Sequence, residues 1–188
     1  MYRQKSKCYN IARKYKFELW GENMRKLIIL RGNSGSGKST IAKELQSRFG
    51  TNTMLISQDA IRRDMLKVKD GKNTLALPLM KELLIYGHGH SEIVILEGIM
   101  YADWYKPLFE LSVQLYGTEV YAYYFDLPFE ETLKRHKTKP NCHEFGEDAM
   151  RRWWREKDFS EVLNEVCITA ERNIDDIVGD ICNTILEA

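Results

Sequence analysis

A glycine-rich segment carries the clearest chemical pattern in this sequence. It reads GNSGSGKS from residue 32 to residue 39 and fits the spacing G-x-x-x-x-G-K-[ST]. Backbone N–H groups of such a loop surround phosphate oxygens, and the following helix adds partial positive charge at its N-terminus. We expect Lys38 to reach the β- and γ-phosphates of ATP or GTP, and the Ser39 hydroxyl to ligate Mg²⁺. The candidate nucleotide-binding residues are Gly32, Asn33, Ser34, Gly35, Ser36, Gly37, Lys38, Ser39 and Thr40.

An aspartate directly follows the second apolar run, in LISQDAIRRDM. Functional groups gather at the carboxyl ends of parallel strands, so Asp59 is predicted to face the phosphate loop. A carboxylate there can accept the proton of an attacking hydroxyl. Arg62, one helical turn later, would hold an anionic acceptor or orient Asp59. The alternative is that Asp59 only caps the helix, with Arg62 as its surface partner.

A glutamate ends the third apolar run, IVILEG. An acid at this strand end commonly lies near the metal ion or its waters, in the role of a Walker B carboxylate, so Glu97 is predicted to be a magnesium-side residue. The alternative interpretation is an exposed acid at the end of a strand.

The segment from residue 132 to residue 157 is rich in lysine and arginine and is interrupted by Pro140 and Gly146. Two helices joined by a loop would form a lid whose cations close over the triphosphate and stabilise the transferring phosphoryl group. Arg135 is the first candidate for the cation that acts on the phosphoryl group, and Arg151 and Arg155 come next. The alternative is a solvated basic helix face.

These candidates need a scaffold, and the hydrophobic pattern predicts one. Short apolar runs alternate with stretches of helical spacing, which indicates an α/β fold. We expect a three-layer P-loop NTPase fold with a five-stranded parallel sheet, flanking helices and a small helical lid. The predicted strands are 26–31, 53–57, 93–96, 119–125 and 166–169. The predicted helices are 38–49, 59–68, 77–86, 105–115, 130–137, 147–157 and 174–186, with a turn at the GHGH of residues 87–90.

The composition narrows the class of protein. The chain has 188 residues, a formal net charge of +1 and 44% hydrophobic residues, typical of one soluble domain rather than a disordered chain. It contains no apolar run near the ~20 residues of a membrane-spanning helix. Its four cysteines are far apart, which predicts reduced thiols and a cytoplasmic location.

The N-terminal residues differ from the rest of the chain. Residues 1–23 are basic and aromatic with loose apolar spacing, whereas Met24 opens the run MRKLIILRG. We interpret residues 1–23 as a basic extension and residues 24–188 as a P-loop kinase domain with its lid at about 132–157. The alternative for the extension is an additional helix packed on the domain.

Absent motifs point to one branch of the P-loop proteins. The sequence has neither the N/T-K-x-D segment with which common GTPases recognise guanine nor the LSGGQ-type signature of transporter ATPases. It is also too short for the helical subdomain of large ring ATPases. Small P-loop kinases remain, and their chemistry needs the metal-side acid, the acceptor-side base and the mobile cations described above.

The motifs resemble those of small AAA-type P-loop kinases, a group that includes the 5′-polynucleotide kinase domain, chloramphenicol phosphotransferase and the zeta-type toxin kinases. The resemblance runs through GNSGSGKST, ISQDAIRRDM, IVILEG and FDLPFEETLKRHKTKP with RRWWREKD, and covers residues 25–188. It implies that Asp59 is the acceptor-side base, that Arg62 holds substrate as in the polynucleotide members, and that Arg135 is the lid arginine. The second lid arginine of polynucleotide kinases falls near Lys137 or Lys139, which weakens a transfer of polynucleotide specificity.

The leading functional prediction is an ATP- and Mg²⁺-dependent kinase that moves the γ-phosphoryl group to a hydroxyl of a small-molecule or nucleotide-like acceptor. The predicted catalytic residues are Lys38, Asp59, Arg62 and Arg135. Two alternatives remain: a 5′-hydroxyl polynucleotide kinase, and a non-catalytic or hydrolytic ATP-binding switch. A nucleic-acid partner is possible but not favoured, no membrane partner is expected, and the sequence does not identify the acceptor.

Overall fold

The computed structural model describes residues 25–138, 142–143 and 145–187. The predicted basic extension, residues 1–23, lies outside the described residues, and its boundary with the kinase domain stays a prediction. Among the residues that are described, no helix has the length and apolar character needed to span a bilayer.

Five parallel strands form the central sheet. They are β1 (Lys26–Gly32), β2 (Thr53–Ser57), β3 (Ile93–Gly98), β4 (Val120–Phe125) and β5 (Glu165–Ile168). The strand order is β2-β3-β1-β4-β5, so β1 lies in the centre between β3 and β4. The phosphate loop therefore leaves the middle of the carboxyl edge of the sheet. The apolar runs of β1 and β3 are almost entirely buried, as expected of strands covered on both faces.

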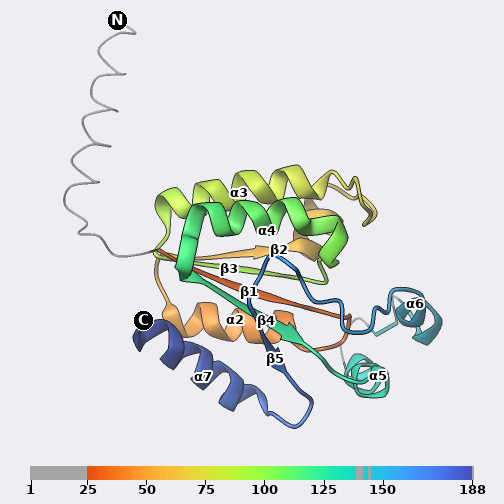
Figure 1. Ribbon diagram of the computed structural model, residues 1–188. Helices are drawn as coiled ribbons and strands as arrows, with labels where there is room; N and C mark the ends of the chain where they lie inside the picture. Colours follow the sequence, from red (N-terminus) through yellow and green to blue (C-terminus); the bar gives the residue numbers. More distant parts are fainter. Residues whose placement is uncertain (1–24, 139–141, 144, 188) are drawn as a thin grey trace, which may run out of the picture.

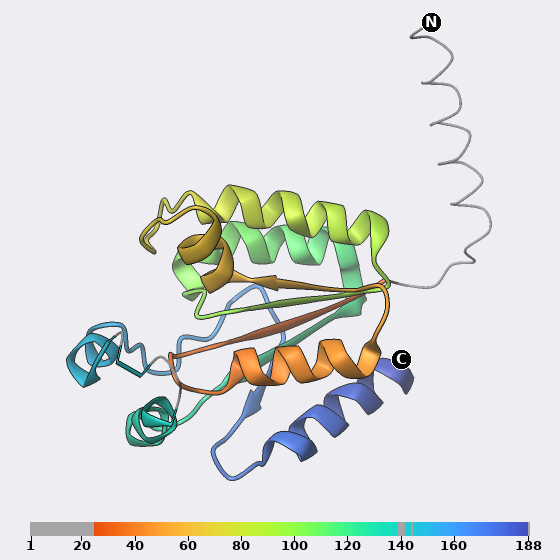
Figure 2. The same cartoon turned by 180° about the vertical axis from the view of Figure 1, so that it is seen from behind.

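Four helices cover the two faces of this sheet and complete three layers (Figures 1 and 2). One face carries α2 (Lys38–Phe49) and α7 (Ile174–Glu187), and the other carries α3 (Ala76–His90) and α4 (Ala102–Tyr116). Each helix pair closes its own cluster of buried apolar side chains against the sheet. The predicted α/β P-loop NTPase fold is confirmed.

Shorter elements lie at the two ends of the strands, and all except the turn that precedes β4 follow a carboxyl end. A π-helical turn, η1 (Ala60–Met65), follows β2, and a 3₁₀ turn, η2 (Gly117–Glu119), precedes β4. The helices α5 (Phe129–Lys137) and α6 (Glu147–Arg152) lie beyond the strand ends (Figure 1). These two helices fall within or beside the predicted lid segment. We call residues 153–158, which follow α6 and lead back to the sheet, the return arm.

Several element boundaries differ by one to three residues from the sequence-based prediction, and three differences are more informative. The helix predicted for 59–68 is the shorter η1, and the helix predicted for 147–157 ends at Arg152 because the return arm bonds to other elements. The GHGH segment is the last turn of α3, not a separate turn. Its Gly87 packs against β3 so closely that an added Cβ would lie 2.7 Å from Cγ2 of Val94. This glycine therefore serves helix–sheet packing.

A fully buried arginine stands at the carboxyl end of β1, immediately before the phosphate loop. The Arg31 guanidinium donates to both carboxylate oxygens of Glu165 on β5, at 2.9 and 3.0 Å. It also donates to the carboxylate and the carbonyl oxygen of Asp158, at 2.8 and 2.7 Å, and to the carbonyl of Met100, at 3.2 Å. Arg31 thus joins β5, the return arm and the loop after β3. Burial raises the pKa of the Glu165 carboxyl, and the Arg31 charge opposes that shift.

Candidate active site

The phosphate loop has the backbone that its glycines predict. Gly35 and Gly37 adopt positive φ angles of 82° and 100°, a region that other residues rarely occupy. The Lys38 side chain is buried, and its ammonium group donates to the carbonyl of Asn33 at 2.7 Å and to the hydroxyl of Ser36 at 2.9 Å. The loop is thus folded around its own lysine, with that ammonium held at the start of α2.

Two loop glycines are required by neighbouring elements as well as by their φ angles. A Cβ on Gly35 would lie 2.5 Å from the carbonyl oxygen of Thr132 in α5. A Cβ on Gly32 would lie 2.8 Å from the carbonyl oxygen of Phe125 at the end of β4. The motif spacing does not require a glycine at position 35, and its structural reason is the direct packing of α5 on the phosphate loop.

The structure brings together the two residues predicted on the metal side. The Ser39 hydroxyl donates to Oε2 of Glu97 at 2.9 Å, and the Ser57 hydroxyl at the end of β2 donates to Oε1. Glu97 is only 3% exposed, so the alternative of an exposed strand-end acid is wrong. A hydroxyl and a carboxylate side by side are oxygen ligands of the kind that Mg²⁺ prefers, and these residues fit such an ion.

The predicted acid–arginine pair lies on η1. Nη2 of Arg62 donates to Oδ1 of Asp59 at 2.7 Å, and Nε of Arg63 lies 3.5 Å from the same oxygen. Asp59 occupies the N-cap position but makes no side-chain capping bond, so its carboxylate is directed at the arginines. The Asp59 side chain is 51% exposed and the Arg62 side chain 15%. The carboxylate therefore stays accessible to a ligand while one of its oxygens is held.

A buried glutamine directly precedes Asp59, and sequence reasoning missed it. Nε2 of Gln58 donates to the carboxylate of Asp70 at 3.0 Å and to the hydroxyl of Tyr105 at 2.6 Å. Its Oε1 accepts the backbone N–H groups of Ile99, at 2.8 Å, and Met100, at 3.3 Å. Gln58 therefore connects the loop before α3, helix α4 and the loop after β3.

The glycine that ends β3 makes room for this glutamine. A Cβ on Gly98 would lie 2.4 Å from Oε1 and 2.6 Å from Cβ of Gln58. In the sequence, the contact between Gly98 and Gln58 is indicated only by the glycine after Glu97. That glycine does not show that Gln58 is the partner.

The three lid arginines have different surroundings. Nη1 of Arg135 donates to the carbonyl of Ser36 in the phosphate loop at 3.3 Å, while its Nε donates to Glu131 at 2.7 Å. Arg151 is 61% exposed, pairs with Glu147 and stacks on the ring of Phe129.

Arg155 belongs to the return arm, and its guanidinium bonds to Asp103. The same guanidinium stacks on the rings of Tyr101 and Trp104, at 3.9 and 5.0 Å from their centroids. Of the three arginines, only Arg135 has a described side-chain contact with the phosphate loop, in keeping with its place as first candidate.

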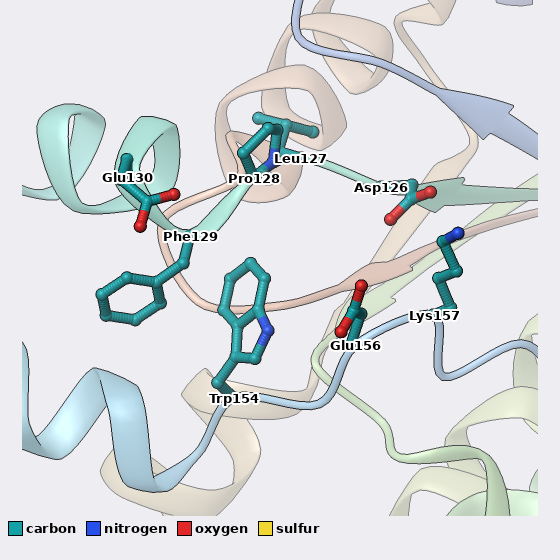
Figure 3. Close-up of a pocket in the computed structure, with 8 residues that line it drawn as sticks. All are labelled: Asp126, Leu127, Pro128, Phe129, Glu130, Trp154, Glu156 and Lys157. Atoms are coloured by element: carbon teal, nitrogen blue, oxygen red, sulfur yellow. The ribbon is translucent and has the colours of Figure 1, made fainter.

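A cavity of about 420 Å³ opens between the start of α5 and the return arm (Figure 3). Its lining residues are Asp126, Leu127, Pro128, Phe129, Glu130, Trp154, Glu156 and Lys157. The rings of Phe129 and Trp154 meet edge to face at one end, with centroids 5.1 Å apart. The four predicted catalytic residues do not line this cavity, which instead separates the two sides of the predicted lid.

A family model described as an AAA domain matches residues 27–157, and the chain belongs to this family. Comparison with curated proteins gave no match. Among solved structures, a gluconokinase from Sinorhizobium meliloti 1021 superposes with a TM-score of 0.65 at 15% identity, over 87% of this chain and 93% of that chain.

Two further solved structures are similar. The APS kinase of Mycobacterium tuberculosis, in complex with AMPPNP and APS, gives a TM-score of 0.60 at 17% identity, over 88% of this chain and 99% of that chain. The shikimate kinase of Acinetobacter baumannii, in complex with shikimate, gives 0.54 at 16% identity, over 88% and 95%. At these identities the comparisons establish a shared fold, that of small P-loop kinases.

Proposed function

We propose that this protein is an ATP- and Mg²⁺-dependent kinase that phosphorylates a hydroxyl of a small-molecule or nucleotide-like acceptor. One observation carries the proposal: the carboxyl ends of β1, β2 and β3 bring three devices to one edge of the sheet. These devices are the lysine-centred phosphate loop, the Ser39–Glu97 oxygen pair and the accessible carboxylate of Asp59. Together they match the needs of phosphoryl transfer.

Each residue has a role in the proposed reaction. The loop N–H groups and Lys38 hold the β- and γ-phosphates, and Ser39 and Glu97 hold Mg²⁺, which when bound neutralises phosphate charge. The Asp59 carboxylate takes the proton of the acceptor hydroxyl as that oxygen bonds to the γ-phosphorus. The bond from the γ-phosphorus to the β–γ bridging oxygen breaks, and ADP leaves. Arg62 orients Asp59, and Arg135 stabilises charge on the transferring group.

The nature of the structural neighbours favours a small acceptor. Gluconokinase, APS kinase and shikimate kinase are named for small molecules, and two of these structures contain APS or shikimate. We carry over only this class of acceptor, because the identities of 15–17% do not transfer a particular substrate. A cytoplasmic site of action remains part of the proposal.

The test is a screen with γ-labelled ATP against nucleosides, sugars, sugar acids, aminoglycosides and oligonucleotides. The Asp59→Asn variant is the blank, and Asp64→Asn, which changes an exposed carboxylate on the same η1 turn, is the matched control. We expect Asp59→Asn to bind ATP normally and to lose about 10²- to 10⁴-fold in transfer rate, while Asp64→Asn keeps the native rate. Native transfer by Asp59→Asn would refute the assigned base. ATP binding without labelling of any acceptor would favour the nucleotide-switch alternative.

A further inference from the structure

The first variable residue of the phosphate loop has a side chain that faces the return arm. Nδ2 of Asn33 donates to the carbonyl of Arg155 at 2.7 Å, and the backbone N–H of Arg155 donates to Oδ1 of Asn33 at 3.1 Å. The Asn33 residue is only 6% exposed. The side-chain amide carries a donor and an acceptor next to each other, so its two bonds to the backbone of one residue imitate the bonding between two strands.

Arg155, whose backbone Asn33 binds, also contacts the start of α4 through its side chain. The Arg155 guanidinium bonds to Asp103 at the start of α4 and lies over the ring of Tyr101. Three residues later, Asp158 is bound by Arg31. Side chains on either side of Gly32 therefore fix the return arm at two points, and Asn33 determines where the Arg155 backbone lies.

Asn33 is also bonded to the lysine of the phosphate loop. Its own carbonyl accepts a hydrogen bond from the Lys38 ammonium at 2.7 Å, and that ammonium is the group predicted to bind the β- and γ-phosphates. A bound triphosphate would accept hydrogen bonds from the loop N–H groups and from Lys38, and this would fix the backbone on both sides of Asn33. The side-chain amide then passes this change to the return arm.

We propose that Asn33 is a positioning residue that couples nucleotide binding to the placement of the return arm and its Arg155. The inference rests on the proposed function only in taking a nucleoside triphosphate as the ligand of the loop. A triphosphate that orders the loop makes release of the arm more costly. By linkage, a bound arm raises the affinity of the loop for the triphosphate by the same factor.

The test measures hydrogen exchange at the Arg155 amide by NMR, with and without Mg²⁺ and a non-hydrolysable ATP analogue. In the native protein we expect the analogue to slow this exchange by roughly 5- to 20-fold, within the usual range of coupling between sites. In Asn33→Ala we expect fast exchange at Arg155, no response to the analogue, and weaker analogue binding by a similar factor.

Two further variants locate the coupling. Gln46→Ala removes another side-chain amide, which donates to the carbonyl of Thr53 at 3.1 Å on the same helix as Lys38 but remote from the arm. It should leave both readouts unchanged. Arg155→Ala keeps the backbone groups that Asn33 binds, so the exchange response should survive there.

Three outcomes separate this inference from the proposed function. An unchanged Arg155 exchange rate at saturating analogue, or an equal response in Asn33→Ala, would overturn the coupling whatever the enzyme phosphorylates. The native-protein response does not depend on how well the variant folds. A clear response with no phosphorylated acceptor would support the coupling and count against the kinase. Absence of analogue binding in calorimetry would overturn both.

Discussion

The two sides of the predicted lid are attached to the phosphate loop by different kinds of interaction. Helix α5 is attached mainly by packing: Thr132 is fully buried, and its carbonyl oxygen lies 2.5 Å from where a Cβ on Gly35 would be. One hydrogen bond, from Arg135 to the Ser36 carbonyl at 3.3 Å, adds to this packing. The return arm is attached by directional bonds from Asn33 and Arg31. Packing loses stability gradually as atoms separate, whereas buried polar bonds leave unsatisfied groups when they break. We therefore expect the α5 side to lose stability gradually when it shifts, and the return arm to be either bound or released.

The largest expected effect comes from breaking the anchor of the return arm. Arg31→Ala would leave the buried carboxylate of Glu165 without its cation and would remove the Arg31 bonds to Asp158, so we expect a loss of about 3–5 kcal/mol in the free energy of unfolding. Urea denaturation measures this loss. Arg48→Ala is the matched control, because its pair with Glu44 is about 40% exposed and should contribute under about 1 kcal/mol. Similar losses in both variants would contradict the view that the buried bonds of Arg31 anchor the return arm.

The packing of α5 on the phosphate loop can be disrupted by adding one methyl group at Gly35. Gly35→Ala combines a positive φ with a Cβ 2.5 Å from the Thr132 carbonyl, so we expect about 2–4 kcal/mol of destabilisation. Gly50→Ala is the control, because φ there is 73° but no atom lies within 4 Å of the added Cβ. It should cost only the backbone strain, about 1–3 kcal/mol. Equal costs from chemical denaturation would show that α5 gives way freely.

The smallest expected effect comes from removing a single hydrogen bond to the return arm. The Tyr101 hydroxyl donates to the carbonyl of Trp153, and burial raises the pKa of Tyr101 from 10.0 to about 12. Tyr101→Phe should lower the unfolding free energy by about 1 kcal/mol at neutral pH. Because the folded pKa is the higher one, this contribution is complete below about pH 10 and is lost as the pH rises towards about 12. Melting temperatures of both proteins across this range test the prediction, and a difference that grows above about pH 10 would contradict it.

The sequence was a good guide wherever a residue type follows directly from a local pattern. The spacing around Lys38 predicted the phosphate loop, and the apolar runs predicted all five strands and their parallel arrangement. The strand-end positions of Asp59 and Glu97 predicted that they would lie near that loop, and the Ser39–Glu97 contact agrees with this. The catalytic and metal-binding roles of these residues remain predictions.

Sequence reasoning failed where a polar side chain bonds across the fold. Arg31 stands at the end of an apolar run, and no periodicity indicates that its partners lie more than 60 residues away. Asn33 fits the motif as a variable position, so its bond to Arg155 has no sequence signal. The helix predicted through residue 157 ended early for the same reason, since these long-range bonds override local helical preference.

The ion pair between Arg31 and Glu165 also bears on the open edge of the sheet. Strand β5 is an edge of the sheet, only four residues long, with Val166 57% exposed. An open edge of this kind can recruit a strand from another molecule, and short strands and inward-pointing charges are among the features that discourage this. Glu165 supplies such a charge. Because Arg31 holds Glu165 at 2.9 and 3.0 Å, the residue that anchors the return arm also fixes this short edge strand to the centre of the sheet.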